Sequence, residues 1–335
     1  MTDTTNDNST LAHKTLLAAL MWGGDIGPAA FRKLLARFGS PEAVAEATIE
    51  QLAAADARLT NYQKVALSQV RNRLQSYADQ IAQLQHSGIT VISYLDASYP
   101  PALNILRNPP PVLCVRGSIS QADRQAVAIV GTRSPTRAES LKAFALAQAF
   151  ARADITVVSG LALGIDTAAH RGALEAGGRT IAVLGNGIQH IYPPDNEPLA
   201  EQIAEDGAIV SEVPPGVKPS VGILMARNRI IAALAVATVV VAAGPTGGSL
   251  VTAKEAAKQD KTVATVVWDE STKDQLTKDR AGNRLLLSQG AFRIRDDHQV
   301  QALSDLVRRQ AAKPLPKSPQ HPAEQDSAPQ LGLFD

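Results

Sequence analysis

The sequence predicts an α/β protein in which a small all-helical domain precedes a Rossmann-like, doubly wound and mostly parallel sheet. Between residues 126 and 300, short runs rich in Val, Ile and Thr alternate with amphipathic stretches, as in parallel sheets buried on both faces. Over residues 11–88, apolar side chains recur at three- and four-residue steps, which is typical of packed helices. The predicted strands are Val127–Val130, Thr156–Val158, Thr180–Leu184, Ala208–Val210, Thr238–Val241 and Thr262–Val266, and the predicted helices include Glu139–Arg152, Asp166–Ala176, Leu199–Glu205 and Leu250–Lys258.

Three further segments complete the predicted organisation. Residues 1–10 are polar and are expected to be disordered. Residues 89–125 contain prolines that force extended backbone, and are expected to form a connector that packs on the core. Residues 301–335 are rich in proline and polar side chains, so a disordered tail is expected there.

The composition narrows the class of protein without choosing its function. The 335 residues, 45% of them apolar, suffice for about two domains. A formal net charge of +1 means that any contact with nucleic acid must come from a local basic patch. The single cysteine, Cys114, fits a reducing compartment. With no signal peptide and no apolar run long enough to span a bilayer, a cytoplasmic protein without membrane contact is expected.

Four glycine-rich loops follow predicted strands, at the edge where parallel sheets bind ligands. Small residues leave backbone N–H groups and helix N-termini free for phosphate oxygens, and Arg133 with Ser134 can bind them through side chains. Any single loop could equally be a tight turn without a ligand, but four together predict a polyanion site. No dinucleotide or nucleoside triphosphate fingerprint is present, and neither a cofactor nor a metal is expected. The loops are Gly131–Ser134, Ser159–Asp166, Gly185–Gly187 and Gly244–Ser249.

A basic segment precedes an apolar run that is expected to be helical. Arg227 and Arg229 flank Asn228, and one arginine could face the phosphates. Alternatively, either arginine could form a salt bridge at the helix start. Because a cation there opposes the helix dipole, the placement favours a compensating anion.

Asp166 and His170 are four residues apart and therefore share one helical face. The pair could perform acid–base chemistry. No nucleophile or metal-ligand cluster is spaced to work with it, so a pair that fixes the shape of the loop is the preferred interpretation.

These motifs resemble the DprA/Smf family, over roughly residues 15–295. The resemblance rests on the Ser159–Asp166 loop with Ala169-His170, and on Tyr192-Pro193, Arg227–Ile231 and Gly248–Ala253. It implies a helical domain similar to a sterile alpha motif, an extended Rossmann fold, and binding of single-stranded DNA without catalysis. It also implies dimerisation through the Rossmann domain and loading of the RecA recombinase in DNA uptake and recombination. By motif position, the expected phosphate contacts are Gly131, Arg133, Ser134, Ser159, Gly160, Gly164, Lys218, Arg227, Arg229, Gly248 and Ser249, with Asp166, His170 and Asn228 shaping the loops.

The chain departs from the family pattern at several points. Many members have Phe-Pro where this chain has Leu224 and Met225, so a base-stacking ring is missing. A Pro-Gly after the last strand is replaced by Val267-Trp268. Many relatives carry a C-terminal winged helix, whereas residues 296–335 are too few and too rich in proline to form one.

The last residues resemble the peptide with which bacterial proteins bind the DNA sliding clamp. Apolar side chains at the end of a polar tail have no core to join, which favours a partner. The candidate residues are Gln330, Leu331, Leu333 and Phe334.

Two other functions stay open. One is a DprA-like regulatory protein that senses DNA or nucleotides, or an antitoxin with a toxin partner in a defence system. The other is a nucleotide phosphoribohydrolase. Its Pro-Gly-Gly-x-Gly-Thr signature is not matched by Pro245–Ser249, which makes this second alternative the weaker one.

Overall fold

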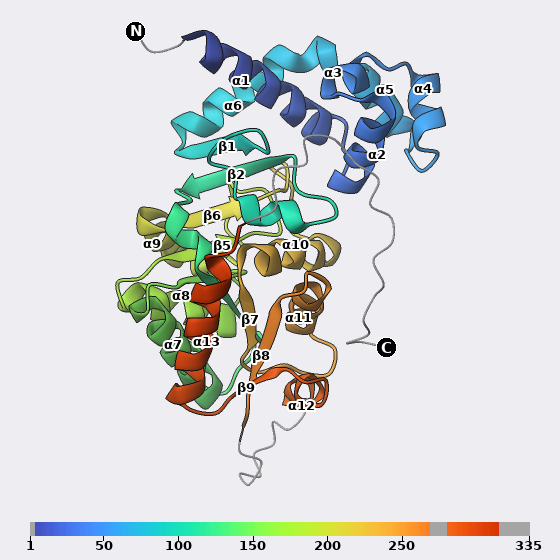
Figure 1. The fold of residues 1–335 in the computed structure, drawn as a ribbon. Coiled ribbons are helices and arrows are strands. Elements are labelled where there is room, and N and C mark those ends of the chain that lie inside the picture. The colour runs from blue at the N-terminus through green and yellow to red at the C-terminus, as the bar shows by residue number, and fades with distance from the viewer. Residues whose placement is uncertain (1–3, 269–279, 315–335) are drawn as a thin grey trace. The chain divides into compact units, whose positions relative to one another are not determined.

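The computed structural model describes residues 4–268 and 280–314 (Figure 1). They form two compact units, and the boundary falls between Arg116 and Gly117. This boundary lies inside the predicted connector 89–125, so most of that segment belongs to the helical unit. Within the described stretches, no helix combines the length and the apolar character needed to cross a bilayer.

The first unit is mainly helical, as the apolar spacing predicted, and ends in an antiparallel hairpin. Thr48 and Thr60 each begin a helix with a capping box, in which the hydroxyl accepts from the third helical amide and a glutamine there returns the bond. The core contains Leu17, Leu34 and Leu52, all without exposed surface. The elements are α1 (Thr4–Ala18), the π-helical turn η1 (Ala19–Gly23), α2 (Pro28–Phe38), α3 (Pro41–Glu46), α4 (Ile49–Ala55), α5 (Asn61–Ser68), the 3-10 turn η2 (Val70–Arg73), α6 (Leu74–His86), β1 (Ile89–Ser93), the 3-10 turn η3 (Pro101–Ile105) and β2 (Val112–Gly117).

The second unit contains the predicted parallel sheet. Its strands follow the order β6-β5-β4-β3-β7-β8-β9, and all of these neighbours are parallel. Residues 127–130 and 237–240 are completely or almost completely buried, as expected for strands covered on both faces. The strands are β3 (Ala126–Val130), β4 (Thr156–Ser159), β5 (Thr180–Val183), β6 (Ala208–Ser211), β7 (Ala237–Val240), β8 (Thr262–Val266) and β9 (Phe292–Ile294).

Helices cover both faces of this sheet, which confirms the doubly wound prediction (Figure 1). Phe150 of α7 and Val157 of β4 belong to a core that also includes Leu303 of α13. Helices α10 and α11 pack on each other on the opposite side (Figure 1). The helices are α7 (Arg137–Arg152), α8 (Ile165–Glu175), α9 (Glu197–Asp206), α10 (Val221–Leu234), α11 (Gly248–Lys258), α12 (Ala281–Ser288) and α13 (Asp297–Ala311), with 3-10 turns η4 (Gln121–Arg124) and η5 (Pro194–Asn196).

Both predictions of disordered ends were partly wrong. Helix α13 runs through Ala311, because Val300, Leu303 and Val307 form an apolar stripe that packs into the core. At the other end, α1 begins at Thr4, where the helix continues backwards from residues buried in the first unit. The clamp-like peptide Gln330, Leu331, Leu333 and Phe334 lies outside the described residues and stays a prediction.

Close packing of α7 on α8 depends on Gly172, and this dependence can be tested. A Cβ at Gly172 would overlap the carbonyl oxygen of Phe144, which belongs to the α7 backbone and cannot swing away. We expect Gly172→Ala to lower the free energy of unfolding by about 1–3 kcal/mol. Gly222→Ala is the control, because a Cβ there meets nothing within 4 Å. Urea unfolding followed by circular dichroism measures both, and an equal response of the two variants would contradict the packing argument.

Candidate functional site

The strand order places a switch point between β3 and β7. The sheet grows from β3 through β4, β5 and β6 on one side, and from β7 through β8 and β9 on the other. At this point the loops after β3 and β7 touch, since the Thr132 amide donates to the Ala242 carbonyl at 2.8 Å. A Cβ at Gly131 would lie 2.9 Å from that same oxygen, so only glycine permits the approach. Ligands of open parallel sheets bind at such crevices.

Arg133 and Ser134 follow this contact directly and are exposed. The Ser134 amide donates to the Thr132 hydroxyl at 3.2 Å, which turns the loop. Within residues 4–268 and 280–314, the Arg133 side chain has no hydrogen-bond or ion-pair partner. Its guanidinium therefore offers its N–H donors to a ligand.

The loop after β4 is shaped from inside by Asp166. The buried carboxylate accepts from the amides of Gly160 at 3.1 Å and Ala162 at 3.4 Å. Burial raises the pKa of Asp166, while the Arg227 guanidinium and these two amides oppose the rise. The Ser159 hydroxyl is buried and donates to the Ile129 carbonyl at 2.6 Å. The Gly160 amide, a predicted backbone contact for phosphate, thus already has a partner in the protein, and so does the Ser159 hydroxyl.

The free part of this loop is Leu163-Gly164. Leu163 is 44% exposed, and in the described part of the chain neither residue's amide donates a hydrogen bond. Gly164 has a φ of +86°, and a Cβ there would lie 2.5 Å from the Thr132 carbonyl. Gly164 thus combines a left-handed backbone, contact with the loop after β3, and a free amide at the start of α8. Amides in this position bind phosphate oxygens.

Arg227 lies deeper than the sequence suggested. Helix α10 begins at Val221, with Ser220 as its N-cap, so Arg227 sits in the second turn and the argument from the helix dipole does not apply. Arg227 as a whole is 5% exposed, and its guanidinium donates to the carbonyls of Gly160, at 2.8 Å, and Val183. Burial lowers the pKa of Arg227 to about 10, Asp166 opposes this, and Arg133 adds to it. Arg227 therefore stays charged at neutral pH and supports the loop from behind.

Arg229 points away from Arg227 and toward the start of the loop after β6. Two residues along a helix turn the side chain by about 200°, so Arg227 and Arg229 lie on opposite sides of α10. Arg229 pairs with Glu212, whose pKa burial raises and Arg229 lowers. Asn228, between the two arginines, donates to the Gly248 carbonyl at 3.1 Å and so fixes the loop that opens α11.

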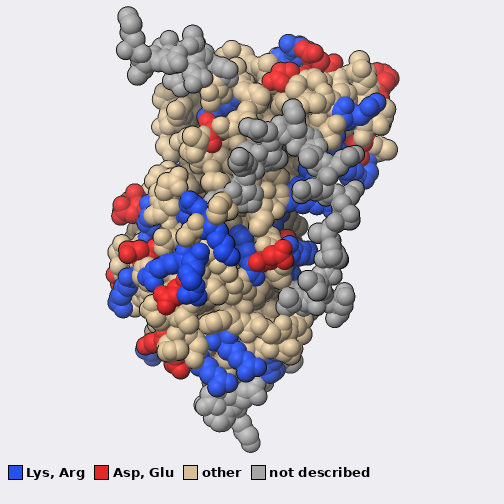
Figure 2. Space-filling model, in the orientation of Figure 1, with Lys and Arg blue, Asp and Glu red and all other residues tan. Residues whose placement is uncertain are grey.

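The three remaining predicted contacts lie after β6 and at the start of α11. Lys218 is exposed in the loop after β6, beside the loop after β5, because the Gly187 amide donates to the Val217 carbonyl at 2.8 Å. Gly248 is the first residue of α11. Ser249, the next residue, is 8% exposed. On the face drawn in Figure 2, Lys and Arg gather in separate groups with Asp and Glu beside them, so the basic character of that face is local.

The capping-box residue Glu139 and its partner Arg280 were not predicted. The pattern Thr136-x-x-Glu139 is a readable capping box, so Glu139 had a signal. Arg280 had none, because 141 residues separate it from Glu139 in the chain. In the described residues, no group of three or more His, Cys, Asp or Glu side chains is arranged to hold a metal.

His170 does not pair with Asp166. Its Nδ1 lies 2.7 Å from the Thr180 hydroxyl oxygen, and its buried Nε2 has no partner within the described residues. Burial, with a smaller contribution from Arg227, lowers the pKa of His170 to about 3. The ring is neutral and inaccessible, which removes it from acid–base chemistry.

This neutral histidine predicts acid sensitivity. The pKa of His170 is about 3 when folded against 6.5 for the free side chain. Between these values the unfolded chain binds the proton more readily, so folding stability falls as the pH drops below about 6.5. We expect His170→Gln to remove about 1–2 kcal/mol of the stability lost between about pH 7.5 and pH 5. Urea unfolding at both pH values measures it, with His86→Gln, exposed on α6, as the control. An unchanged pH dependence in His170→Gln would refute the assignment.

Comparison with known proteins identifies the family. Residues 90–304 match the family model of DNA recombination-mediator protein A. The chain belongs to the DprA/Smf family. The match covers the hairpin of the first unit and almost the whole second unit.

Relatives named Smf or DprA support the same family. The chain is 41% identical over 222 residues to Protein Smf of Synechocystis, covering 62% of this chain and 56% of that protein. It is 37% identical to DNA processing protein DprA of Bacillus subtilis, covering 56% of this chain and 63% of that protein. The matches thus span little more than half the length of these relatives. Among solved structures, DprA of Streptococcus pneumoniae has a TM-score of 0.68 at 28% identity, covering 84% of this chain and 95% of that one.

A DprA structure from Helicobacter pylori, described for its single-stranded DNA binding mode, has a TM-score of 0.57 at 28% identity. That match covers 66% of this chain and 96% of the other. The likeness therefore extends to a relative with a stated ligand.

Proposed function

We propose that this chain binds single-stranded DNA at the carboxyl edge of the sheet in its second unit and acts as a recombination mediator. The observation that carries the proposal is the Arg133 guanidinium at the switch point, which is exposed and has no partner among the described residues. The amides of Leu163 and Gly164, which donate to no described residue, and the exposed Lys218 add donors for successive phosphates. Support also comes from the family and from the H. pylori relative, which is described as binding single-stranded DNA.

Arg227 serves this function without touching the strand. Its charge is held behind the loop after β4 and attracts phosphates through the field, while Gly131, Gly248 and Ser249 shape the neighbouring loops. The site acts by binding alone. Asp166 and His170, its candidate acid–base pair, are buried and occupied by other contacts.

The partners we propose are the RecA recombinase and a second copy of this chain. A mediator that holds a strand through its phosphates leaves the bases open to a recombinase. The pathway we propose is homologous recombination, including the processing of DNA taken up in transformation.

The Arg133→Ala variant tests the binding site. In fluorescence anisotropy with labelled oligo-dT, the variant should bind at least about tenfold more weakly than the wild type. The slope of log affinity against log salt concentration should be smaller in magnitude by about one, because one phosphate contact is lost. Lys258→Ala is the control, since Lys258 ends α11 at the opposite edge of the sheet and pairs with Glu255. Unchanged affinity in Arg133→Ala would refute the site. Release of free base from a nucleotide would refute the binding-only function.

Recombinase loading is a separate prediction. On single-stranded DNA coated with single-strand-binding protein, wild-type chain should shorten the lag before RecA filaments form, and Arg133→Ala should not. Filament growth followed by ATP hydrolysis measures the lag. If the wild-type chain binds oligo-dT but leaves the lag unchanged, the proposed binding site stands and the proposed mediator function is refuted.

A further inference from the structure

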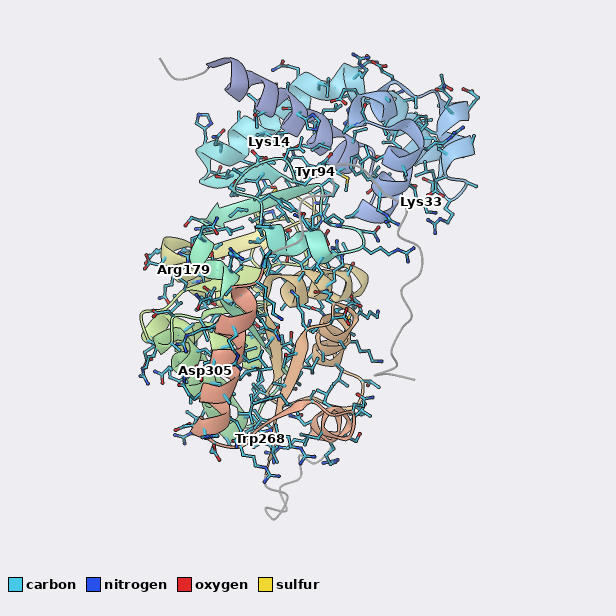
Figure 3. The ribbon with its side chains drawn as sticks, in the orientation of Figure 1. Lys14, Lys33, Tyr94, Arg179, Trp268 and Asp305 are labelled. Atoms are coloured by element: carbon cyan, nitrogen blue, oxygen red, sulfur yellow. The ribbon has the colours of Figure 1, made fainter. Side chains whose placement is uncertain are left out.

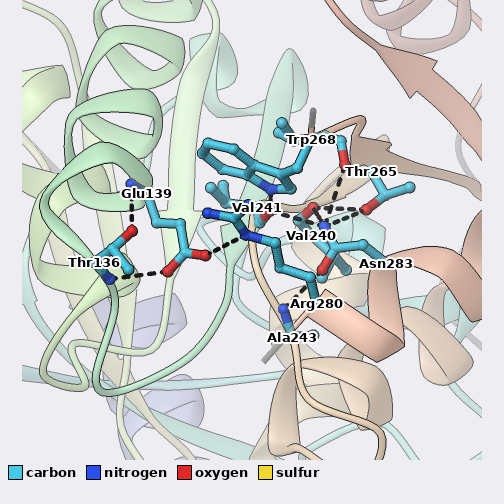
Figure 4. A network of polar contacts seen from close by, with 10 residues as sticks. Thr136, Glu139, Val240, Val241, Ala243, Thr265, Trp268, Arg280 and Asn283 are labelled. Atoms are coloured by element: carbon cyan, nitrogen blue, oxygen red, sulfur yellow. Dashed lines mark hydrogen bonds and ion pairs between the residues drawn. The ribbon is translucent and has the colours of Figure 1, made fainter. Parts of the chain in front are cut away.

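A second group of residues, gathered near the end of β8, is connected by polar contacts to the loop that carries Arg133. Figure 4 shows the group: Glu139 at the start of α7, Trp268 two residues after β8, and Arg280 at the start of α12. Trp268 and Arg179 mark opposite edges of the same sheet, since Arg179 directly precedes β5 (Figure 3). The group is therefore on the carboxyl edge, with the loops described above.

Glu139 fixes one end of the Arg133 loop. Its carboxylate accepts from the Thr136 amide at 2.9 Å, and the Thr136 hydroxyl accepts from the Glu139 amide at 3.2 Å. Glu139 is 1% exposed, and the other carboxylate oxygen accepts from Nε of Arg280 at 2.8 Å. A buried carboxylate needs such a counter-charge, because leaving it uncompensated is strongly destabilising.

Trp268 connects Arg280 to the other end of the Arg133 loop. The Arg280 guanidinium lies over the indole ring, 4.5 Å from its centroid, and the indole N–H donates to the Val241 carbonyl at 2.8 Å. The next residue, Ala242, accepts the hydrogen bond from the Thr132 amide. Arg280 is thereby connected to Thr132 as well as to Thr136.

Asn283 holds Arg280 and its helix in place. The amide of this side chain, 2% exposed, donates to the Val241 carbonyl and the Thr265 hydroxyl, both at 2.8 Å, and its oxygen accepts from the Ala243 amide at 2.8 Å. Gly282 admits no side chain, because a Cβ there would lie 2.5 Å from the Gly244 carbonyl. The start of α12 is therefore fixed to the ends of β7 and β8.

The geometry points to a positioning function for Glu139, Trp268 and Arg280, which we call the loop clasp. The clasp holds residues 132–136 at both ends, so Arg133 and Ser134 are presented in one conformation to a phosphate. Arg280 is the shared member and acts through the loop rather than by contact with the strand. This inference rests on the proposed single-stranded DNA binding, and it adds residues from a distant part of the chain to that site.

A double-mutant cycle between Arg280→Met and Arg133→Ala tests the clasp in the full-length chain. At low salt, where weakened binding stays measurable, Arg280→Met should lower the affinity for oligo-dT about tenfold in the wild-type background and less than about twofold in Arg133→Ala. Arg308→Met is the control: it removes an arginine paired with Asp305 on α13 and should leave the affinity unchanged. An equal loss in both backgrounds would overturn the inference, because Arg280 would then act independently of Arg133.

Hydrogen exchange gives a readout that does not need DNA. In Arg280→Met, the amides of Thr132 and Thr136 should exchange about tenfold faster, while those of α9 stay unchanged. Arg280→Lys, which keeps the charge but loses the planar stack, should be intermediate and serves if Arg280→Met does not fold. Unchanged exchange at both threonines would overturn the clasp. If wild-type chain fails to bind oligo-dT while exchange responds as expected, the proposed function fails and the clasp stands.

Discussion

The site depends on the approach of two backbones at the ends of β3 and β7. The Thr132 amide and the Ala242 carbonyl share a hydrogen bond of 2.8 Å, and no side chain fits at Gly131 between them. This contact joins the two halves of the sheet at the switch point. The loop after β4 contacts the Thr132 carbonyl as well, through Gly164 and the Ile165 amide. The short stretch Gly131-Thr132 therefore sets the relative positions of the loops after β3, β4 and β7.

Around that contact, buried charged side chains fix the shape of the loops, which regular secondary structure does not do. Loops of small residues have few apolar side chains to pack, so their shape must come from hydrogen bonds to fixed groups. One carboxylate oxygen of Asp166 accepts from two amides of the loop after β4, and the Arg227 guanidinium donates to the Gly160 carbonyl of the same loop. The loop clasp does the same for the Arg133 loop. In each case the charged side chain stands on a helix, which is more rigid than the loop that it supports.

The sequence predicted the sheet well, because its evidence was local. The strand cores, such as 127–130 and 262–266, were found within about a residue, since continuous Val, Ile and Thr runs report burial directly. Boundaries depended on weaker signals. The start of α10 was placed after Arg229 although Ser220 caps the helix. Arg227 and Arg229 were therefore both predicted to contact phosphate, whereas the helix directs Arg227 to the loop after β4 and Arg229 to Glu212. The end of α13 was missed because the proline-rich composition that follows hid its apolar stripe.

Long-range pairing lay beyond any local pattern. Thr136-x-x-Glu139 indicates a helix start, but nothing near it indicates that Arg280 neutralises the carboxylate. His170 shares a helical face with Asp166, yet its partner is Thr180 at the start of the next strand. Spacing along a helix establishes which residues are near each other, whereas the packing of other elements decides which of them bond.

The charge distribution explains how a chain of net charge +1 can offer a site to a polyanion. Three acidic side chains that support the loops are paired within the protein. Asp166 faces two amides and the Arg227 guanidinium, Glu139 faces Arg280, and Glu212 faces Arg229. Arg133 and Lys218 have no such partner within the described residues. These two exposed cations are therefore available to an anion, although the acidic and basic residues of the whole chain nearly balance.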